Sequence, residues 1–388
     1  MSPLKILMIS SDRKLLEAGS AVSERIGEYG ALVEELHVVV FALKFLGLKE
    51  KQIAPNVRVY PTNSLSRWFY IYDAIHLGKK LVLEKKFVRG KSIITTQDPF
   101  ECGLVGLKVK KKWRLPLEVQ LHTDPFSPYF SGFLNSLRKR IARKVLRNAD
   151  SIRVVTLNLK SQISNLTKTE IRVLPIYIDR ERIENAQITF DLHARYLWRF
   201  ILLAVSRLAP EKNLSLAINA LALVREKFPH TGLIIVGSGP EEGRLKIFVK
   251  KLKLAGAVEF VGWQNDLTSF YKTANAFIQT SLFEGYGLSL VEAGLSGLPV
   301  ITTPVGIALE LKQGKDAYIY PLDMARGKPA GNPELFAQGI IDLIENNSHR
   351  ENLRNNLKHT LEVKLISKDD YMAQIKDNWE ETAKKVKA

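Results

Sequence analysis

The chain has 388 residues, more than one hydrophobic core usually supports, so its length predicts two domains. Apolar residues make up 46% of it, and no window approaches the roughly 18 apolar residues of a membrane-spanning helix, which argues against an integral membrane protein. The single cysteine, Cys102, excludes an intramolecular disulfide and favours a reducing compartment, so we expect a cytoplasmic protein.

The net charge of +17 at pH 7 is concentrated in the first half of the chain. Residues 1–190 contain 32 Lys and Arg against 18 Asp and Glu, whereas residues 191–388 contain 25 against 22. The basic residues cluster in residues 79–91, 108–114 and 138–147. Such clusters attract nucleic acid, anionic lipid or a phosphorylated substrate, or they form only a solvated surface.

The N-terminal residues predict a buried strand at 5–10, a helix over 21–36 with apolar residues at steps of three and four, and a second strand at 38–42. This order is typical of a doubly wound α/β domain. Gly19 and Ser20 lie where the first helix opens, but they do not form the G-x-G-x-x-G fingerprint of dinucleotide-binding folds.

Residues 65–88 contain four closely spaced aromatic residues, Trp68, Phe69, Tyr70 and Tyr72, followed by basic residues. This composition suits a membrane interface or an acceptor groove, and it suits core packing equally well. Further strands are predicted at 92–96 and 117–121. His122 follows the second of them, where α/β folds keep their chemistry, although a lone histidine there is often structural.

A basic helix at 138–148 and strands at 151–155 and 171–174 complete the first half, and the composition changes near residues 176–198. We therefore expect an N-terminal domain over residues 1–190 and a second domain over 191–370. Both are expected to be Rossmann-like. The remaining residues, 371–388, are expected to form a C-terminal helix, and the charged end of the chain, which contains Trp379, is expected to be exposed.

The second half repeats the strand–helix rhythm, and polar loops follow three of its strands. The strand at 200–206 leads to Arg207 and Lys212, the strand at 233–236 leads to Gly237-Ser238-Gly239-Pro240, and the strand at 276–279 leads to a loop ending at Gly287. A helix over 288–296 and a strand at 300–302 follow this last loop, and residues 318–320 are the last strand expected.

These loops bring together residue types that suit a ligand with phosphates and hydroxyls. Arg207 and Lys212 suit a diphosphate, because arginine grips two oxygens and lysine adds a point charge. Glycines let the backbone approach a ligand closely, and a helix N-terminus attracts phosphate. Glu284 and Glu292, eight residues apart, can accept hydrogen bonds from ribose or sugar hydroxyls, or they are two solvated surface glutamates.

Taken together, the chain resembles the family 4 glycosyltransferases, which are retaining enzymes of the GT-B fold. The resemblance rests on SRLAPEKNL around Arg207 and Lys212, on the GSGP turn, and on the two glutamates of FEGYGLSLVEAGLSGLPVITTPVG. It extends over nearly the whole chain and is best over residues 200–310. It implies two facing Rossmann-like domains with the site in the cleft between them, and a last helix, over residues 371–388, that packs back on the N-terminal domain.

The resemblance also implies roles for individual residues. A nucleotide-diphosphate sugar, UDP- or GDP-linked, would lie on the C-terminal domain, with Arg207 and Lys212 stabilising the diphosphate as it leaves. Glu292 would bind the ribose. Glu284 would contact the sugar hydroxyls, and the backbone at Tyr286, Gly287 and Leu288 would lie beside it.

In the N-terminal domain, Gly19 would let the first loop approach the phosphates, and His122 would contact the sugar near the reacting carbon. Gly237 and Gly239 would lie close to the donor. The family typically needs neither metal nor cofactor, and no D-x-D pair follows a strand here. The implied activity is hexosyl transfer to a saccharide or lipid-linked acceptor in cell-envelope polysaccharide or glycolipid synthesis. The basic and aromatic N-terminal half separately predicts peripheral contact with anionic lipid at the inner membrane face.

Three positions depart from the family pattern. Ser20 replaces a second glycine of the first loop, Ile176-Tyr177 replaces Asn-Gly after Pro175, and Ile307 follows Gly306 where a second glycine is common.

Three other readings compete with glycosyl transfer. A sugar-nucleotide epimerase shares the fold and the donor, but it would not need a basic and aromatic acceptor domain. A nucleic-acid-binding protein would explain the charge but not the paired cations and glutamates, and no nucleic-acid-binding signature is present. An NAD-dependent oxidoreductase would need the missing glycine fingerprint.

Overall fold

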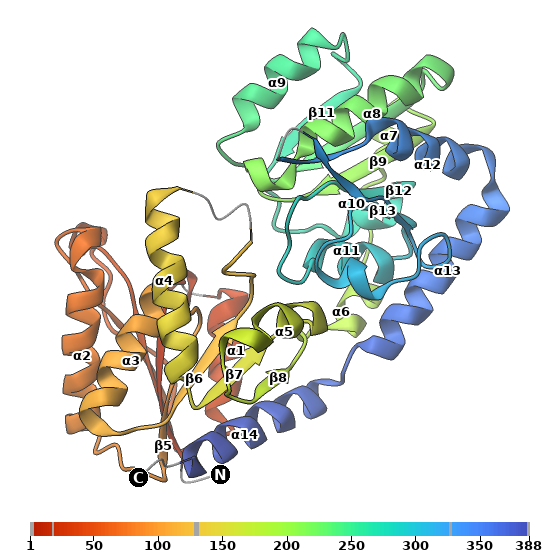
Figure 1. Cartoon of the computed structure of the whole chain (residues 1–388). Helices are drawn as coiled ribbons and strands as arrows, with labels where there is room; N and C mark the ends of the chain where they lie inside the picture. The colour runs from red at the N-terminus through yellow and green to blue at the C-terminus, as the bar shows by residue number, and fades with distance from the viewer. Residues whose placement is uncertain (1–3, 18, 128–131, 326–327, 386–388) are drawn as a thin grey trace. The chain divides into compact units, whose positions relative to one another are not determined.

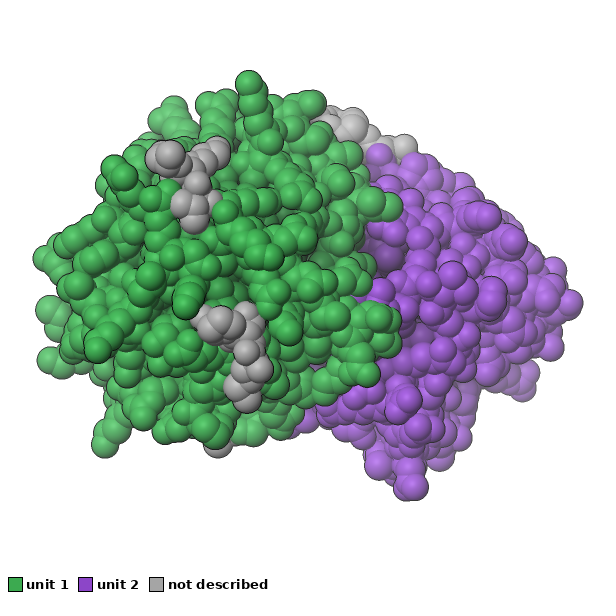
Figure 2. Space-filling view, turned by 90° about the horizontal axis from the view of Figure 1, so that it is seen from below, with its two compact units in different colours: residues 1–176, 367–388 green, residues 177–366 purple. Residues whose placement is uncertain are grey.

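A computed structural model describes residues 4–17, 19–127, 132–325 and 328–385 of the chain. It divides into two compact units, residues 1–176 with 367–388 and residues 177–366 (Figure 2). The division after Ile176 lies before the expected boundary at 190/191. The intervening segment packs on the second unit: Lys272 Nζ donates to the carbonyls of Glu184 and Ala186 at 2.7 and 2.6 Å, and the Thr189 N–H donates to Ser269 Oγ at 2.8 Å.

Unit 1 contains an eight-stranded sheet with the order β3-β4-β2-β1-β5-β6-β7-β8. Its strands are parallel except for β3, which runs antiparallel to β4. The strands are β1 (Lys5–Ser10), β2 (Glu35–Val40), β3 (Lys51–Ala54), β4 (Val57–Pro61), β5 (Ser92–Thr96), β6 (Leu117–Leu121), β7 (Ser151–Val154) and β8 (Ile171–Val173). The five central strands are almost entirely buried, as expected for a parallel sheet covered on both faces.

Helices cover both faces of this sheet (Figure 1). On one face α2, α3 and α4 lie side by side, and on the other α1 and α14 meet where Tyr29 contacts Trp379 edge to face. The helices are α1 (Ala21–Gly30), α2 (Tyr70–Glu84), α3 (Glu101–Trp113), α4 (Phe133–Asn148), α5 (Leu157–Ile163) and α14 (Lys368–Lys384), with short 3-10 turns η1 (Arg13–Leu16), η2 (Lys44–Leu46), η3 (Arg67–Phe69) and η4 (Ser164–Leu166).

The last helix, α14, is not exposed, which corrects the expectation from its charged composition. Trp379 is fully buried, and its Nε1 donates to Glu118 Oε2 on β6 at 2.9 Å. Asn378 Nδ2 donates to the other oxygen of Glu118 at 2.6 Å, and Arg153 Nε lies 3.3 Å from that oxygen. The helix is therefore fixed to unit 1 by a buried ionic network as well as by apolar packing.

Unit 2 contains a parallel six-stranded sheet with the order β11-β10-β9-β12-β13-β14. Its strands are β9 (Phe200–Val205), β10 (Thr231–Val236), β11 (Val258–Gly262), β12 (Ala276–Gln279), β13 (Val300–Thr302) and β14 (Tyr318–Ile319). A separate antiparallel hairpin, β15 (Leu322–Ala325) and β16 (Lys328–Gly331), follows where the sequence predicted no further strand.

The helices of unit 2 are α6 (Arg180–Asn185), α7 (Leu192–Arg195), α8 (Leu214–Lys227), α9 (Glu242–Lys251), α10 (Thr268–Thr273), α11 (Leu288–Leu295), α12 (Pro333–Glu345) and α13 (Asn347–Lys364), with 3-10 turns η5 (Pro210–Lys212) and η6 (Gly306–Glu310). The main core lies between α8, α12 and the strands β9 and β10. In the parts of the chain that the structure describes, no helix combines the length and apolar character needed to cross a bilayer.

Candidate active site

The sheet of unit 2 reverses its winding between β9 and β12. The chain proceeds from β9 to β10 and β11 on one side, and then crosses back to β12 on the other side of β9. The loops after β9 and β12 therefore diverge at the carboxyl ends of two adjacent parallel strands, which is where open α/β sheets bind their ligands. Arg207 and Lys212 follow β9, and Glu284 follows β12.

Two of the predicted residues meet at this point. Lys212 Nζ lies 2.6 Å from Glu284 Oε1, and the side chains are only 18% and 13% exposed. Ser281 Oγ donates to the same carboxylate oxygen at 2.7 Å. Because it is partly withdrawn from water, this ion pair is electrostatically stronger than one on the open surface.

The loops that carry the pair are joined to each other directly. Thr280 Oγ1 donates to the Lys212 carbonyl at 3.0 Å, and the Leu282 N–H donates to the Glu211 carbonyl at 2.8 Å. Thr303 Oγ1, just after β13, donates to the Ser281 carbonyl at 2.5 Å. The lysine and the glutamate are thus positioned by hydrogen bonds among the loops after β9, β12 and β13, and not by the ion pair alone.

Arg207 is placed differently from Lys212. Its side chain is 69% exposed and forms an ion pair with Glu211, four residues on. The sequence pattern assigned both cations to one ligand group and did not identify Glu211 as a partner. An exposed guanidinium with one carboxylate contact keeps donors available for a further anion.

The two glycines after β10 are required because a side chain at either position would collide with the neighbouring β9 loop. Gly237 has φ +128°, and a Cβ there would lie 2.0 Å from the Ser206 carbonyl oxygen. A Cβ at Gly239 would lie 2.3 Å from the Leu208 carbonyl oxygen, and the Leu208 N–H donates to the Ser238 carbonyl at 2.9 Å. These glycines therefore let the β10 loop pack directly on the β9 loop that carries Arg207.

The loop after β12 opens helix α11 through Gly287, whose φ of +96° favours glycine. Leu288 is the first helical residue and is exposed, whereas Tyr286 is buried. The Tyr286 carbonyl accepts a hydrogen bond from the Ile307 N–H at 2.7 Å, and a Cβ at Gly306 would lie 2.4 Å from that oxygen. The departure at Ile307 therefore coexists with a glycine that is sterically required next to it.

Glu292 lies in the second turn of α11, where Tyr271 Oη of α10 donates to its Oε2 at 3.0 Å. Burial raises the pKa of the Glu292 carboxyl above its usual value, and the Tyr271 hydrogen bond partly offsets this increase. The sequence did not point to Tyr271, because it belongs to a helix that shows no polar pattern of its own.

A small pocket between the ends of β9 and β12 is lined in part by Ser206, Lys212, Gln279 and Glu284. Gln279 is 5% exposed, and its Oε1 has no hydrogen-bond partner among the described residues; the same holds for Ser206 Oγ. A buried amide oxygen without a partner is uncommon in folded proteins and marks a position that a ligand or water donor would satisfy. A polar residue that ends an apolar strand was the only sequence signal for Gln279.

Gly19 and His122 belong to unit 1, at the carboxyl ends of its strands. Gly19 has φ +66° and nothing within 4 Å of an added Cβ, so its backbone conformation rather than crowding favours glycine. Ser20 caps α1, because its Oγ accepts from the Ser23 N–H at 3.1 Å. His122 directly follows β6, its side chain is exposed, and its Nε2 lies 3.3 Å from Gln120 Oε1.

Two protein-family models match the chain, one to each half. The model of glycosyl transferases group 1 matches residues 190–360, and that of Glycosyltransferase Family 4 matches residues 30–182.

Curated relatives carry related descriptions. An alpha-monoglucosyldiacylglycerol synthase of Streptococcus pneumoniae is 28% identical over 54% of this chain and 51% of its own length. The GtfA subunit of a UDP-N-acetylglucosamine–peptide N-acetylglucosaminyltransferase of Streptococcus agalactiae is 31% identical over 62% of this chain and 48% of its own. An uncharacterized glycosyltransferase of Methanocaldococcus jannaschii is 23% identical over 92% and 93%. The chain thus spans about half the length of the first two relatives.

Solved structures confirm the predicted fold class. HepE of Anabaena, in complex with UDP and glucose, has a TM-score of 0.72 and 19% identity, with 96% of this chain and 98% of that one covered. A sucrose-phosphate synthase of Thermosynechococcus elongatus has a TM-score of 0.75 and 17% identity, with 97% and 98% covered.

Proposed function

The chain belongs to the family 4 glycosyltransferases of the GT-B fold, and on this premise we propose that it transfers a hexosyl group, with retention, from a UDP- or GDP-linked sugar to a saccharide or lipid-linked acceptor. The observation that carries the proposal is the Lys212–Glu284 pair at the point where the unit 2 sheet reverses its winding. The descriptions of the relatives, one of which makes a glycolipid, support a role in cell-envelope polysaccharide or glycolipid synthesis.

In this reaction the bond between the sugar and the diphosphate breaks, and negative charge develops on the leaving phosphate oxygen. Lys212 and Arg207 stabilise that charge, because both are cationic groups held on the loop after β9. Glu284 orients Lys212 through one oxygen and offers the other to hydroxyls of the donor sugar. The cations supply charge that a metal ion provides in other transferases, so we propose a metal-independent reaction without a cofactor.

Other residues complete the proposed donor site. Glu292 binds the ribose hydroxyls, the backbone of Tyr286, Gly287 and Leu288 faces the donor, and Gly237 and Gly239 shape the loop beside it. In unit 1, Gly19 borders the phosphates and His122 contacts the sugar near the reacting carbon.

The pH dependence of donor binding tests the role of Glu292. The ionised carboxylate accepts hydrogen bonds from the ribose, so affinity for a nucleotide sugar is expected to fall as the pH drops through the raised pKa of Glu292. Tyr271→Phe removes a hydrogen bond that lowers this pKa, so the fall is expected to begin at a higher pH. Calorimetric titrations with the nucleotide sugar at a series of acidic pH values give the pH at which affinity is half lost in the wild type and in Tyr271→Phe. In the control Glu292→Gln this pH dependence of affinity should be absent. An identical midpoint in Tyr271→Phe and in the wild type would contradict the role of Glu292 in ribose binding.

Thermal stability in the presence of nucleotides tests the donor class. UDP or GDP at 100 times its dissociation constant is expected to stabilise the protein by about 2.7 kcal/mol, with and without Mg²⁺. Arg207→Ala should abolish most of this shift, whereas Lys250→Ala on α9, an exposed lysine of the same unit, should preserve it. Stabilisation by NAD alone, or by no nucleotide, would contradict the proposal.

Product analysis separates the transferase from a sugar-nucleotide epimerase. A transferase releases UDP or GDP in proportion to added acceptor, whereas an epimerase converts the donor without releasing the nucleotide. Acceptor-independent conversion of the donor to its epimer would therefore favour the alternative.

We also propose peripheral contact with anionic membrane through unit 1. Three of the four clustered aromatic residues are exposed: Trp68 at 87%, Phe69 at 49% and Tyr72 at 61%. Tyr70 is half-buried and stacks on Phe41. Helix α4 exposes Phe133 and Leu134 beside its basic residues. Apolar and basic groups together are typical of segments that bind the lipid interface.

Vesicle sedimentation at low salt tests this contact. Vesicles that contain phosphatidylglycerol are expected to bind the protein, and Trp68→Ser with Tyr72→Ser should weaken binding. Leu197→Ser, at a residue of unit 2 that is 97% exposed, serves as the matched control. Equal binding of all three proteins, or none, would remove the membrane from the proposal.

A further inference from the structure

A basic cavity lies at the edge of the unit 1 sheet where β7 and β8 begin, at Ser151 and Ile171. Its volume is about 890 Å³, within the roughly 300–1,000 Å³ of small-molecule sites. His122 follows the opposite end of the parallel strand β6, and Lys212 and Glu284 belong to unit 2. The cavity is therefore distinct from the proposed donor site.

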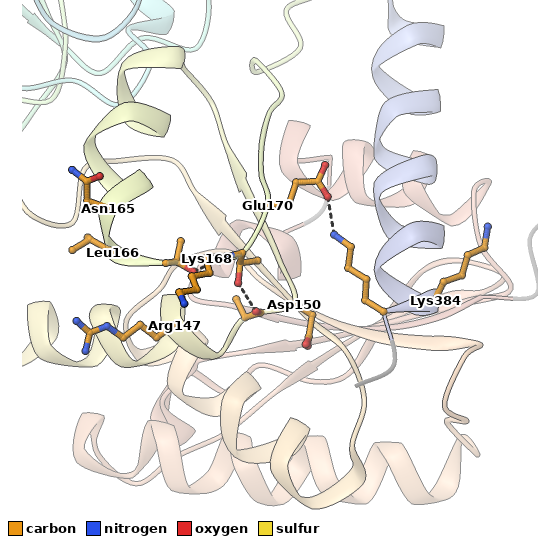
Figure 3. Close-up of a pocket in the computed structure, with 11 residues that line it drawn as sticks. Arg147, Asp150, Asn165, Leu166, Lys168, Glu170 and Lys384 are labelled. Carbon is orange, nitrogen blue, oxygen red and sulfur yellow. Dashed lines mark hydrogen bonds and ion pairs between the residues drawn. The ribbon is translucent and has the colours of Figure 1, made fainter. Parts of the chain in front are cut away.

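Four cations line this cavity, namely Arg147, Lys168, Lys384 and Lys385. Arg147 and Lys168 lie on the α4 side, and Lys384 extends from α14 (Figure 3). A neighbouring pocket of about 380 Å³ shares part of this wall and adds Lys110, Lys111 and Arg114.

The two acidic residues of the cavity are already paired. Asp150 forms an ion pair with Lys110 and accepts the Leu117 N–H at 2.8 Å. Glu170 lies 2.9 Å from Lys385 Nζ and 3.4 Å from Arg172 Nε. Among the described residues, Arg147, Lys168 and Lys384 have no carboxylate within ion-pair distance.

The negative ends of the nearby helix dipoles are too weak to balance the positive charge of the cations that line the two pockets. Helices α3, α4 and α14 all end at this edge, and a helix C-terminus carries about half a negative charge. Three such ends and the two carboxylates offset about half of the seven cations, which leaves a surplus of about three to four positive charges.

The carbonyls near the end of α4 also have other donors. Thr167 Oγ1 donates to the Leu146 carbonyl at 3.0 Å, Thr169 Oγ1 donates to the Ala149 carbonyl at 2.9 Å, and Lys110 Nζ donates to the Asn148 carbonyl at 2.8 Å. These contacts join residues 167–169 to the end of α4 and give the cavity a fixed wall. The cations without a carboxylate are thus not needed to cap this helix.

We propose that this cavity binds a small soluble anion that carries two or more phosphate groups. The charge surplus matches a diphosphate or triphosphate better than a single carboxylate. Arginine and lysine side chains suit phosphate oxygens, because a guanidinium binds two of them and an ammonium adds a point charge. The inference does not depend on the glycosyl-transfer proposal.

Calorimetric titration with inorganic pyrophosphate and triphosphate tests the site on the full chain. Arg147→Gln with Lys168→Gln is expected to weaken binding by about tenfold or more, since each charged hydrogen bond lost is a substantial part of the affinity. Lys250→Gln with Lys251→Gln, on exposed positions of α9, removes the same charge elsewhere and should leave affinity unchanged. Melting temperatures without ligand establish that both variants fold. Lys384→Gln, on α14, removes a further lining cation and is also expected to weaken binding.

The variant Arg207→Ala distinguishes pyrophosphate binding in this cavity from binding at the proposed donor site. If pyrophosphate binding survives Arg207→Ala and is lost in Arg147→Gln with Lys168→Gln, the cavity is the site. If Arg207→Ala abolishes it, the phosphate occupies the donor site and the inference is wrong. Equal loss in the α9 control would indicate general charge attraction. Binding only to phosphatidylglycerol vesicles, and to no soluble phosphate, would overturn the assignment to a soluble ligand.

Discussion

Lys212→Ala is expected to lower kcat with the correct nucleotide sugar by about 10²–10³-fold, the usual effect of removing one group that stabilises charge developing in a transition state. On the proposed assignment, the substitution removes a cation that stabilises the leaving diphosphate. It also leaves Glu284, which is 13% exposed, without its ion-pair partner. Released nucleoside diphosphate measured at saturating donor gives kcat directly.

Two further variants separate chemistry from folding. Lys227→Ala, at a lysine of unit 2 whose ion pair with Glu345 is exposed, should leave kcat unchanged. Lys212→Ala with Glu284→Gln removes both charges, so its melting temperature should recover relative to Lys212→Ala while activity stays low. A Lys212→Ala enzyme that keeps nearly full kcat would exclude this lysine from the reaction.

Glu118→Ala is expected to lower the free energy of unfolding of unit 1 by about 3–5 kcal/mol, the usual effect of breaking a buried ionic network. Arg153 would remain buried without its counter-charge, and both Trp379 Nε1 and Asn378 Nδ2 would lose the acceptor that holds α14. Urea denaturation followed by tryptophan fluorescence measures the change. Glu170→Ala, whose ion pairs are exposed, should cost no more than about 1 kcal/mol. A similar small value for Glu118→Ala would mean that apolar packing alone fixes the helix.

The strand–helix rhythm, the strand ends and the loops of the site could be predicted from the sequence, because each depends on local pattern. Element ends were less accurate: α1 stops at Gly30, whereas the pattern continued to residue 36 through Leu32 and Val33. The hairpin of β15 and β16 was missed, since each strand has only four residues and β16 contains Pro329 and Gly331, which are uncommon in strands.

Partners that are distant in sequence could not be predicted in this way. The composition of α14 is largely polar and by itself predicted an exposed helix. Its buried face depends on distant partners such as Glu118, 261 positions from Trp379. The ion pair of Arg207 with Glu211 and the unsatisfied oxygen of Gln279 likewise depend on how side chains meet in space.

The position of α14 has a consequence for the order in which the protein is made. Unit 1 is discontinuous, since its first part ends at Ile176 and its closing helix begins at Lys368, with all of unit 2 between them. On the ribosome, the residues that complete unit 2 emerge before Trp379 is synthesised. Unit 2, although second along the chain, is therefore the first that can finish folding. The buried pair of Glu118 and Arg153 lacks its contact with Trp379 until translation is nearly complete.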